Sequence, residues 1–291
     1  MNALILMRRN LRLFFRDRVG VFFSLLSALI LIALYALFLG SLQVDNLHDR
    51  FPDASISDIT WFVNAWVFAG ITMITTITTG LAGLSVFVDD GASGRFRDFL
   101  VSPIRRVDLV VGYMAASFVV AMVMTSVIIL VGQLYLLLQG DALMTPPELL
   151  RCLGYVAAAA AAFSALSSFV VTFLSTSNAF AALSTIVGTI IGFLAGAYIP
   201  AGTLPDGVVS VMNALPFAQA AMVIRLPYMA GATAALTDGQ SQAQDALDTF
   251  YGMSATVGDM AVTPGIALAE LGVVFVVFLV LGVWRIGRRI R

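Results

Sequence analysis

Residues 152–205 read CLGYVAAAAAAFSALSSFVVTFLSTSNAFAALSTIVGTIIGFLAGAYIPAGTLP, and none of these 54 side chains is charged. A helix that crosses a membrane needs about 20 apolar residues, so the run is long enough for two crossings. The only turn-like break inside it is STSN, at Ser175–Asn178. The run therefore predicts two membrane-spanning helices joined as a hairpin.

The composition of the whole chain agrees with this prediction. Of the 291 residues, 60% are hydrophobic and 11% are charged, and the mean hydropathy is +0.96. Soluble domains are typically about 45–50% apolar and about 25% charged, so a soluble fold would lack the polar surface to cover this chain. We expect an all-α membrane protein with residues 1–291 in a single transmembrane domain.

Six segments are long and apolar enough to span a membrane. They are Val19–Ser41, Ile59–Val88, Leu109–Leu138, Cys152–Leu174, Ala179–Tyr198 and Pro264–Trp284. Residues 3–17 are amphipathic. Leu4, Met7, Leu11, Phe14 and Phe15 share one face, and Arg8, Arg12 and Arg16 form a stripe on another. This pattern predicts a helix that lies in the membrane interface before the first span.

Residues 199–263 differ from the spans. Gly207–Ile224 is apolar but short; it lies between Pro205 and Pro227 and is broken by Pro216, which favours re-entrant or external helices. Residues 231–259 are polar and predict an external loop or small cap.

The arginines predict the orientation. With six spans, 13 of the 16 arginines fall on the side of the two termini, of residues 89–108 and of the Ser175–Asn178 turn. Arg50, Arg151 and Arg225 fall on the other side. Because arginine accumulates in cytoplasmic loops, we expect a multi-pass protein of the cell membrane with both termini in the cytoplasm.

Several functions are excluded by composition. The chain contains no lysine, and a Walker A phosphate loop requires one, so we expect no ATP hydrolysis by this route. Cys152 is the only cysteine and His48 the only histidine, which leaves neither a disulfide nor a Cys/His metal site. The net charge of −1 gives no argument for a nucleic-acid partner. No nucleophile–base pair is evident, so we expect no enzyme activity and no cofactor in this chain.

Three features inside the spans are candidates for function. A hydroxyl stripe on the second span is either a packing surface or a wall of a substrate pathway, and it consists of Thr72, Thr75, Thr76 and Thr79. Glycines at four-residue spacing on the fifth span favour close helix packing, including contact between subunits: Gly188, Gly192 and Gly196. Glu270 is either a functional group within the sixth span or lies at its outer boundary.

The most polar stretch is DDGASGRFRDFLVSPIRR, Asp89–Arg106, in which seven of 18 residues are charged. A helix over Gly94–Val101 would place Phe96, Phe99 and Leu100 on one face, between Arg95, Arg97 and Asp98, and Pro103 would end it. An apolar ridge with a charged rim is typical of a protein docking site. The alternative is an ordinary cytoplasmic loop at the lipid headgroups.

Extended to Tyr113, this stretch resembles the first cytoplasmic loop of the type-2 ATP-binding-cassette (ABC) exporter permeases. The elements of that pattern are Asp90, Gly94, Leu100, Val101, Ser102, Pro103, Arg106, Asp108 and Gly112. The family usually has Glu at the position of Asp90 and commonly Lys at that of Tyr113. A second stretch, GAYIPAGTLPDGVVSVMNALPFAQAAMVIR at Gly196–Arg225, resembles the family's segment after the fifth span. The resemblance covers essentially the whole chain except residues 231–259.

The resemblance implies a permease subunit that pairs with a second permease subunit, as a homodimer or heterodimer. Two separate ATPase subunits would bind ATP and Mg²⁺ beneath the pair. The coupling helix that contacts the ATPase would be formed by Asp90, Gly94, Arg95, Phe96, Arg97, Asp98, Phe99, Leu100, Pro103 and Arg106. The expected function is export of an amphipathic, drug-like or lipid-linked substrate. The alternatives are an ATP-independent carrier or channel and a membrane assembly protein that transports nothing.

Overall fold

The computed structural model describes residues 2–96 and 104–289, the last three of them by backbone alone. The first half contains α1 (Asn2–Arg16), α2 (Arg18–Leu34), the π-helix η1 (Tyr35–Leu39), α3 (Gly40–Arg50), α4 (Ile56–Ala82), α5 (Ser85–Ala92) and α7 (Arg106–Gln139). The second half contains α8 (Pro146–Val171), α9 (Ser177–Leu194), the 3₁₀ turn η2 (Ala201–Thr203), α10 (Asp206–Asn213), α11 (Pro216–Thr237), α12 (Ser241–Phe250) and α13 (Pro264–Arg289). A two-stranded antiparallel hairpin, β1 (Thr256–Val257) and β2 (Met260–Ala261), precedes α13.

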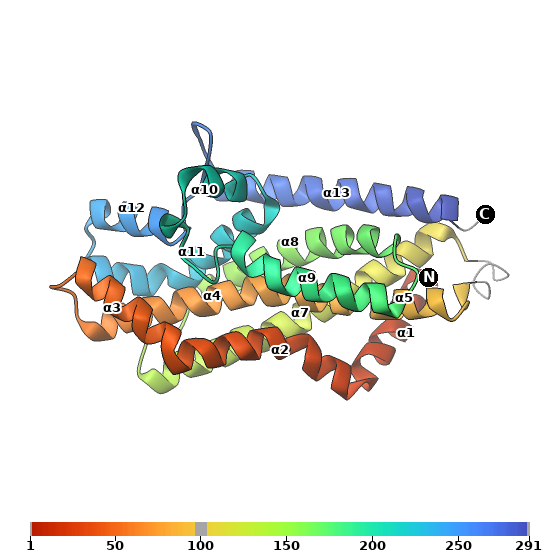
Figure 1. Ribbon diagram of the computed structural model, residues 1–291, viewed down its shortest axis with the longest axis horizontal. Coiled ribbons are helices and arrows are strands. Elements are labelled where there is room, and N and C mark those ends of the chain that lie inside the picture. Colours follow the sequence, from red (N-terminus) through yellow and green to blue (C-terminus); the bar gives the residue numbers. More distant parts are fainter. Residues whose placement is uncertain (1, 97–103, 290–291) are drawn as a thin grey trace.

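The long helices form one elongated bundle (Figure 1). One end carries α1, α5 and the end of α13, and is called the terminal end; the other carries α3 and α12, and is called the cap end. Helices α2, α7 and α9 run to the cap end, and α4, α8 and α13 run back. The prediction of an all-α membrane protein is therefore confirmed, with six passes along the bundle and both termini at the same end.

Seven helices in the described part of the chain are long and apolar enough to cross a membrane, and the additional one is α11. It begins with Phe217 stacked on Phe163, in the middle of α8, with 5.4 Å between ring centroids. It reaches Trp61, near the start of α4, at Gly231. Helix α11 thus follows only part of the bundle, and a re-entrant course stays a prediction. The predicted break at Pro216 coincides with the start of α11, whereas Pro227, predicted as the far boundary of the segment, lies inside the helix.

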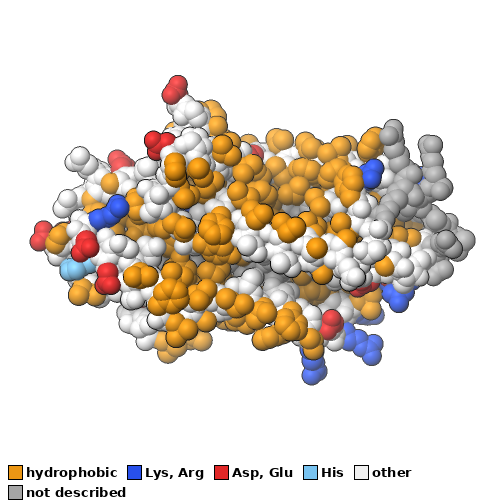
Figure 2. Space-filling model, in the orientation of Figure 1, with side chains coloured by type: hydrophobic (Ala, Val, Ile, Leu, Met, Phe, Trp, Pro, Cys, Tyr) orange, Lys and Arg blue, Asp and Glu red, His pale blue; other side chains and the backbone are white. Residues whose placement is uncertain are grey.

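Helix α4 lies at the centre of the bundle and is almost entirely buried, with Phe62 and Trp66 among the largest buried side chains. Helices α2, α9 and α13 instead expose large apolar side chains such as Phe22, Ile186 and Val273. In Figure 2 hydrophobic side chains cover the middle of the molecule, and charged side chains gather toward its two ends. This is the surface of a protein with a lipid-facing band.

Local capping explains where several helices begin. The Thr176 hydroxyl accepts from the Ala179 N–H at the start of α9, so the predicted break between two helices is confirmed, although Ser177 and Asn178 already belong to α9. Two other boundaries differ from prediction. The first apolar segment continues as helix through η1 to Arg50, and the second is interrupted at Gly83 and Leu84, so that α5 is a separate short helix.

Helix α1 packs on the protein through a face that was not predicted. Leu6, Asn10 and Phe14 are buried, whereas Leu4 and Phe15 are exposed. The close approach is made possible by a glycine of α7: a Cβ at Gly112 would lie 2.7 Å from the Leu6 Cβ. The arginine stripe is exposed as predicted, at Arg8, Arg12 and Arg16.

Candidate coupling network and transport groove

A groove of about 990 Å³ lies between α2 and α9. Asp17 and Asp89 line it at the terminal end, and Tyr35 and Tyr198 line it at the cap end. Its walls are mainly apolar and carry scattered hydroxyls, from Phe23, Ser24, Ser27, Leu31, Leu34, Thr78, Thr185 and Thr189. The groove thus offers apolar contact together with a few hydrogen-bonding groups, which is the usual composition of a small-molecule site.

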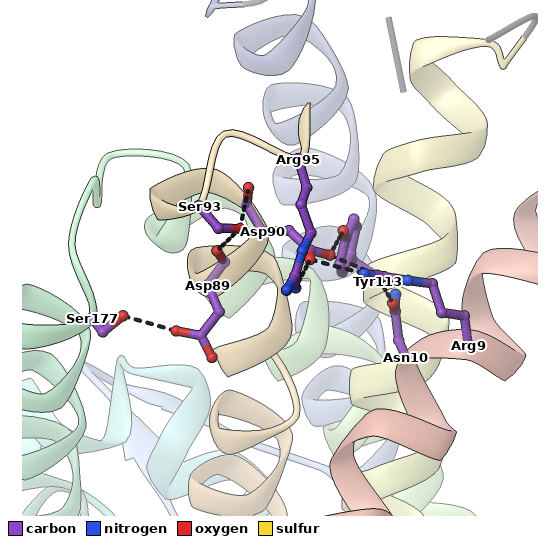
Figure 3. A network of polar contacts seen from close by, with 8 residues as sticks. All are labelled: Arg9, Asn10, Asp89, Asp90, Ser93, Arg95, Tyr113 and Ser177. Atoms are coloured by element: carbon purple, nitrogen blue, oxygen red, sulfur yellow. Dashed lines mark hydrogen bonds and ion pairs between the residues drawn. The ribbon is translucent and has the colours of Figure 1, made fainter. Parts of the chain in front are cut away.

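A buried carboxylate lies at the terminal end of this groove (Figure 3). The side chain of Asp90, in α5, is fully buried. Arg9 of α1 donates to both of its oxygens, at 2.6 and 2.8 Å, and Arg95 donates to Oδ1 at 3.1 Å. The Tyr113 hydroxyl of α7 donates to Oδ2. A buried charge is tolerated only when it is paired and hydrogen-bonded, and Asp90 meets both conditions.

Neighbouring contacts connect α5 to further elements. The Ser177 hydroxyl, at the start of α9, donates to Asp89 Oδ1 at 2.8 Å. Arg9 also donates to Asn10 Oδ1 at 3.0 Å. The short helix α5 is therefore bonded through side chains to α1, α7 and α9, as Figure 3 shows.

The contacts of the network favour the charged form of Arg9. The hydrogen bond to Asp90 raises the pKa of Arg9 above its ordinary value, against the opposing effect of partial burial. The side chains of Arg9 and Arg95 remain 31% and 56% exposed, so both keep contact with water while Asp90 has none. The network is a buried anion between two partly hydrated cations.

An aromatic cluster supports the network, and it includes a residue that we expected to face a partner. Phe96 lies 5.1 Å from Phe87 and 6.4 Å from Tyr113, measured between ring centroids. A Cβ at Gly91 would lie 3.0 Å from the Phe96 ring. Phe96 is half-buried and packs against this cluster, and its predicted contact with a partner stays a prediction.

The structure places the other predicted coupling residues as follows. Gly94 has φ 77°, a left-handed conformation that favours glycine, immediately after the end of α5. Arg106 begins α7 and is exposed. The remaining ones lie outside the described residues: Arg97, Asp98, Phe99, Leu100 and Pro103.

The threonine stripe lies inside the bundle. All four hydroxyls are buried, and each donates to the carbonyl four residues earlier in α4; they belong to Thr72, Thr75, Thr76 and Thr79. Thr125 of α7 also donates to Thr76, at 3.2 Å. In this structure the stripe packs inside the bundle and does not line the groove, and its role as a wall of a pathway stays a prediction. The threonine of α4 that lines the groove is Thr78.

The three glycines of α9 have three different environments. A Cβ at Gly188 would meet nothing within 4 Å, whereas one at Gly192 would overlap the ring of Tyr198. Gly196 has φ 58° and follows the end of the helix. Within the chain, only Gly192 accommodates a close neighbour, and a contact between subunits at these glycines stays a prediction.

Other candidates contribute little. Glu270 is half-buried in α13, and Cys152 is buried and free. Among the described side chains, no three of His, Cys, Asp and Glu gather where a metal ion could bind.

Sequence reasoning missed one residue. Arg225 of α11 is buried, and its guanidinium donates to the carbonyls of Ala195, Gly196 and Gly252 at 3.0, 2.6 and 3.1 Å. The sequence contains a signal for this residue, because Arg225 is a single arginine in a long apolar segment. The sequence predicts Arg225 as an outer charge and as the end of the family-like stretch from Gly196, but predicts no contact for it.

The sequence model of the family described as "ABC-2 type transporter" matches residues 1–226. The chain belongs to the ABC-2 type transporter family. No curated protein matches it. The match covers the network and the groove and ends within α11.

Family membership identifies the kind of subunit. An ABC-2 membrane domain is the transmembrane permease of an ABC transporter; it is not itself the ATPase, and its partner is an ABC ATPase. The resemblance of the Asp90–Gly112 stretch to this family is thereby confirmed. Two elements of the family pattern have a physical role here: Asp90 holds the network, and Gly112 lets α1 approach α7.

Proposed function

We propose that this ABC-2 permease is the membrane subunit of an exporter that moves an amphipathic substrate, drug-like or lipid-linked, out of the cytoplasm along the α2–α9 groove. Two permease subunits pair, and two ATPase subunits bind ATP and Mg²⁺ at the terminal end, which is cytoplasmic in a cell membrane. The observation that carries the proposal is the Asp90 network, because it connects the segment before the predicted coupling helix to both walls of the groove.

The first connection runs to α2. Asp90 is bound to Arg9 in α1, and α1 is joined to α2 through a single residue, Asp17. The Asp17 carboxylate caps α2 by accepting from the Gly20 N–H at 2.9 Å. A displacement of α5 therefore pulls on α1 and, through the short connection, on the α2 wall.

The second connection runs to α9. Asp89 is adjacent to Asp90 in α5 and holds Ser177, the first residue of α9. One short helix therefore carries both connections. Work delivered at the loop after Gly94 is expected to change the separation of α2 and α9, and hence the width of the groove.

The groove itself supports an amphipathic substrate. Its side walls are apolar, while Asp17, Asp89 and several hydroxyls lie toward the terminal end and along the helices. We propose that the docking contact with the ATPase includes Phe99 and Leu100, flanked by Arg97 and Asp98.

The test uses Asp90→Asn in the complex with its ABC ATPase, reconstituted in proteoliposomes. The substitution keeps the shape of the side chain but weakens both ion pairs. We expect ATP-dependent transport of a fluorescent amphiphile to fall by about fivefold or more, the range of typical coupling energies, while ATPase binding persists. The matched control is Asp45→Asn, at an exposed position of α3.

Two results would overturn the proposal. Transport that continues when the ATPase subunit cannot hydrolyse ATP would favour an ATP-independent carrier. Transport that is unaffected by Asp90→Asn, with the complex intact, would show that work enters elsewhere.

A further inference from the structure

At the cap end of the groove a hydrogen bond joins its two walls. The hydroxyl of Tyr35, which follows α2, donates to the main-chain carbonyl of Tyr198, which follows α9, at 3.0 Å. Both residues line the groove, and the Tyr35 side chain is buried. This contact lies at the opposite end of the groove from the Asp90 network.

The Tyr35 side of the contact has an irregular backbone. Tyr35 is the first residue of the π-helix η1, which interrupts an otherwise continuous helix from α2 to α3. A Cβ at Gly40 would lie 2.7 Å from the Tyr35 carbonyl oxygen, so a glycine is needed to form this turn. Single π-turns inside α-helices are frequent at functional sites, and the backbone can change conformation locally at such a turn.

The Tyr198 side is held by α9 itself. The Tyr198 ring folds back over Gly192, where any larger residue would overlap it, and the Tyr198 hydroxyl donates to the Gly188 carbonyl at 3.1 Å. These contacts fix the direction of the main chain after α9. They orient the carbonyl that Tyr35 binds.

A second layer fixes this segment to the cap. Arg225 binds the carbonyls of Ala195 and Gly196 at the end of α9, and also the carbonyl of Gly252 after α12. Trp66 lies beneath the guanidinium, 5.8 Å from its carbon, and donates from Nε1 to the Tyr251 carbonyl at 3.0 Å. The end of α9 and the cap therefore share the same anchors.

We propose that the Tyr35–Tyr198 contact is the outer gate of the groove and that Arg225 is the positioning residue that holds the α9 side of this gate in place. Opening separates the Tyr35 hydroxyl from the Tyr198 carbonyl by a change in η1, while the α9 end stays fixed to α11 and the cap. This assignment rests on the proposed function, since it takes the groove as the route of the substrate.

The assignment explains why a π-helix lies at this depth of the bundle. The proposed gate needs one wall whose backbone can change conformation and one wall that stays fixed. The α2 wall has the irregular turn at Tyr35, and the α9 wall has two carbonyls within three residues of Tyr198, those of Ala195 and Gly196, that a buried arginine binds.

The test measures access to the groove from the cap end. A single cysteine is introduced by Ser27→Cys, which lines the groove, in a Cys152→Ala background that removes the native thiol. The probe is a charged, membrane-impermeant maleimide, added to sealed vesicles that hold the full-length permease without ATPase or ATP. A second protein with Ser241→Cys, exposed on α12, reports which side of the vesicle carries the cap end.

Two gate variants are compared with two matched controls. Tyr35→Phe removes the hydroxyl, and Gly192→Ala displaces the Tyr198 ring. The controls are Tyr135→Phe, whose hydroxyl accepts only from the exposed Gln139 in the described part of the chain, and Gly272→Ala in α13, which has open space for the added methyl.

We expect both gate variants to be labelled at Ser27→Cys from the cap side a few-fold to about tenfold faster, as for the loss of one partly buried hydrogen bond. The controls should be labelled at the rate of the parent protein. An unchanged rate in both gate variants would overturn the proposal, and so would an equal increase in the controls. Because no ATPase is present, the result does not depend on coupling through Asp90, and failure of the gate is distinguishable from failure of the exporter assignment.

Discussion

Asp90 and Arg225 are buried charges near opposite ends of the same groove, but they are neutralised in different ways. Asp90 binds side chains, two of which are arginines that remain partly in water. Arg225 binds main-chain carbonyls, and two of its three bonds are fully buried. Side chains in contact with water can exchange one partner for another, whereas main-chain carbonyls are fixed by the fold. The difference indicates a coupling element at the terminal end and a structural anchor at the cap end.

The position of each charge agrees with this distinction. Ala195 and Gly196 lie at the carboxyl end of α9, where helix carbonyls lack partners and a positive charge is favourable. Arg225 thus satisfies groups that the helix cannot satisfy itself. Asp90 instead joins elements that are far apart in sequence, and it lies beside the loop that we propose contacts the ATPase.

The largest effect is expected from Arg225→Met, which tests whether Arg225 is a structural anchor. Three carbonyls lose their donor, two of them fully buried, and each such group contributes about 1–3 kcal/mol when it is left unsatisfied. Removal of a buried charge offsets part of this loss. We expect a net destabilisation of about 3 kcal/mol, seen as a lower thermal unfolding temperature of the purified permease in detergent.

The control for this prediction is Arg151→Met, at an exposed position of α8, which should leave the unfolding temperature unchanged. If Arg225→Met were as stable as the parent protein, the cap end would be no more fixed than the terminal end. The distinction between anchor and coupling element would then be lost.

The passes along the bundle were predictable because they depend on local composition. The uncharged run at residues 152–205 and the turn at Ser175–Asn178 follow from hydropathy and turn chemistry alone. Helix α11 was harder to predict, because a proline usually ends a helix, whereas Pro227 lies inside this one. Tertiary packing of α11 against α4 and α8 overrides the local signal.

The site was less predictable than the fold. The sequence resemblance identified Asp90, but its partner Arg9 is 81 residues away and lies outside the predicted stripe of Arg8, Arg12 and Arg16. Helical spacing could not predict that Phe96 packs against Phe87 and Tyr113, because these rings come from other helices. The threonine stripe had two interpretations with the same pattern, and its burial could not be predicted from that pattern.

A smaller effect is expected from Gly112→Ala, which sharpens the comparison by disturbing the network without altering any of its residues. The added Cβ would lie 2.7 Å from the Leu6 Cβ and 3.1 Å from the Ala3 carbonyl oxygen, so α1 must shift away from α7. Arg9 would move with α1, and we expect ATP-dependent transport to fall by a few-fold, within the range of typical coupling energies.

The matched control is Gly154→Ala in α8, where the methyl group meets nothing within 4 Å. Alanine favours a helix over glycine by about 1 kcal/mol, so this variant should be as stable as the parent or slightly more so. Equal transport by the two variants would show that the contact between α1 and α7 plays no part in coupling.

The smallest effect is expected from Thr75→Val, which tests whether α4 carries a signal or substrate between the two regions. The Thr75 hydroxyl donates to the Ile71 carbonyl of its own helix at 2.8 Å, and valine keeps nearly the same shape. We expect a change of less than about 1 kcal/mol in the free energy of unfolding and no change in transport. The comparison is Thr78→Val, which alters the lining of the groove and should change the preference among substrates. Loss of transport in Thr75→Val, with the protein folded, would place the substrate route along the threonine stripe and not along the α2–α9 groove.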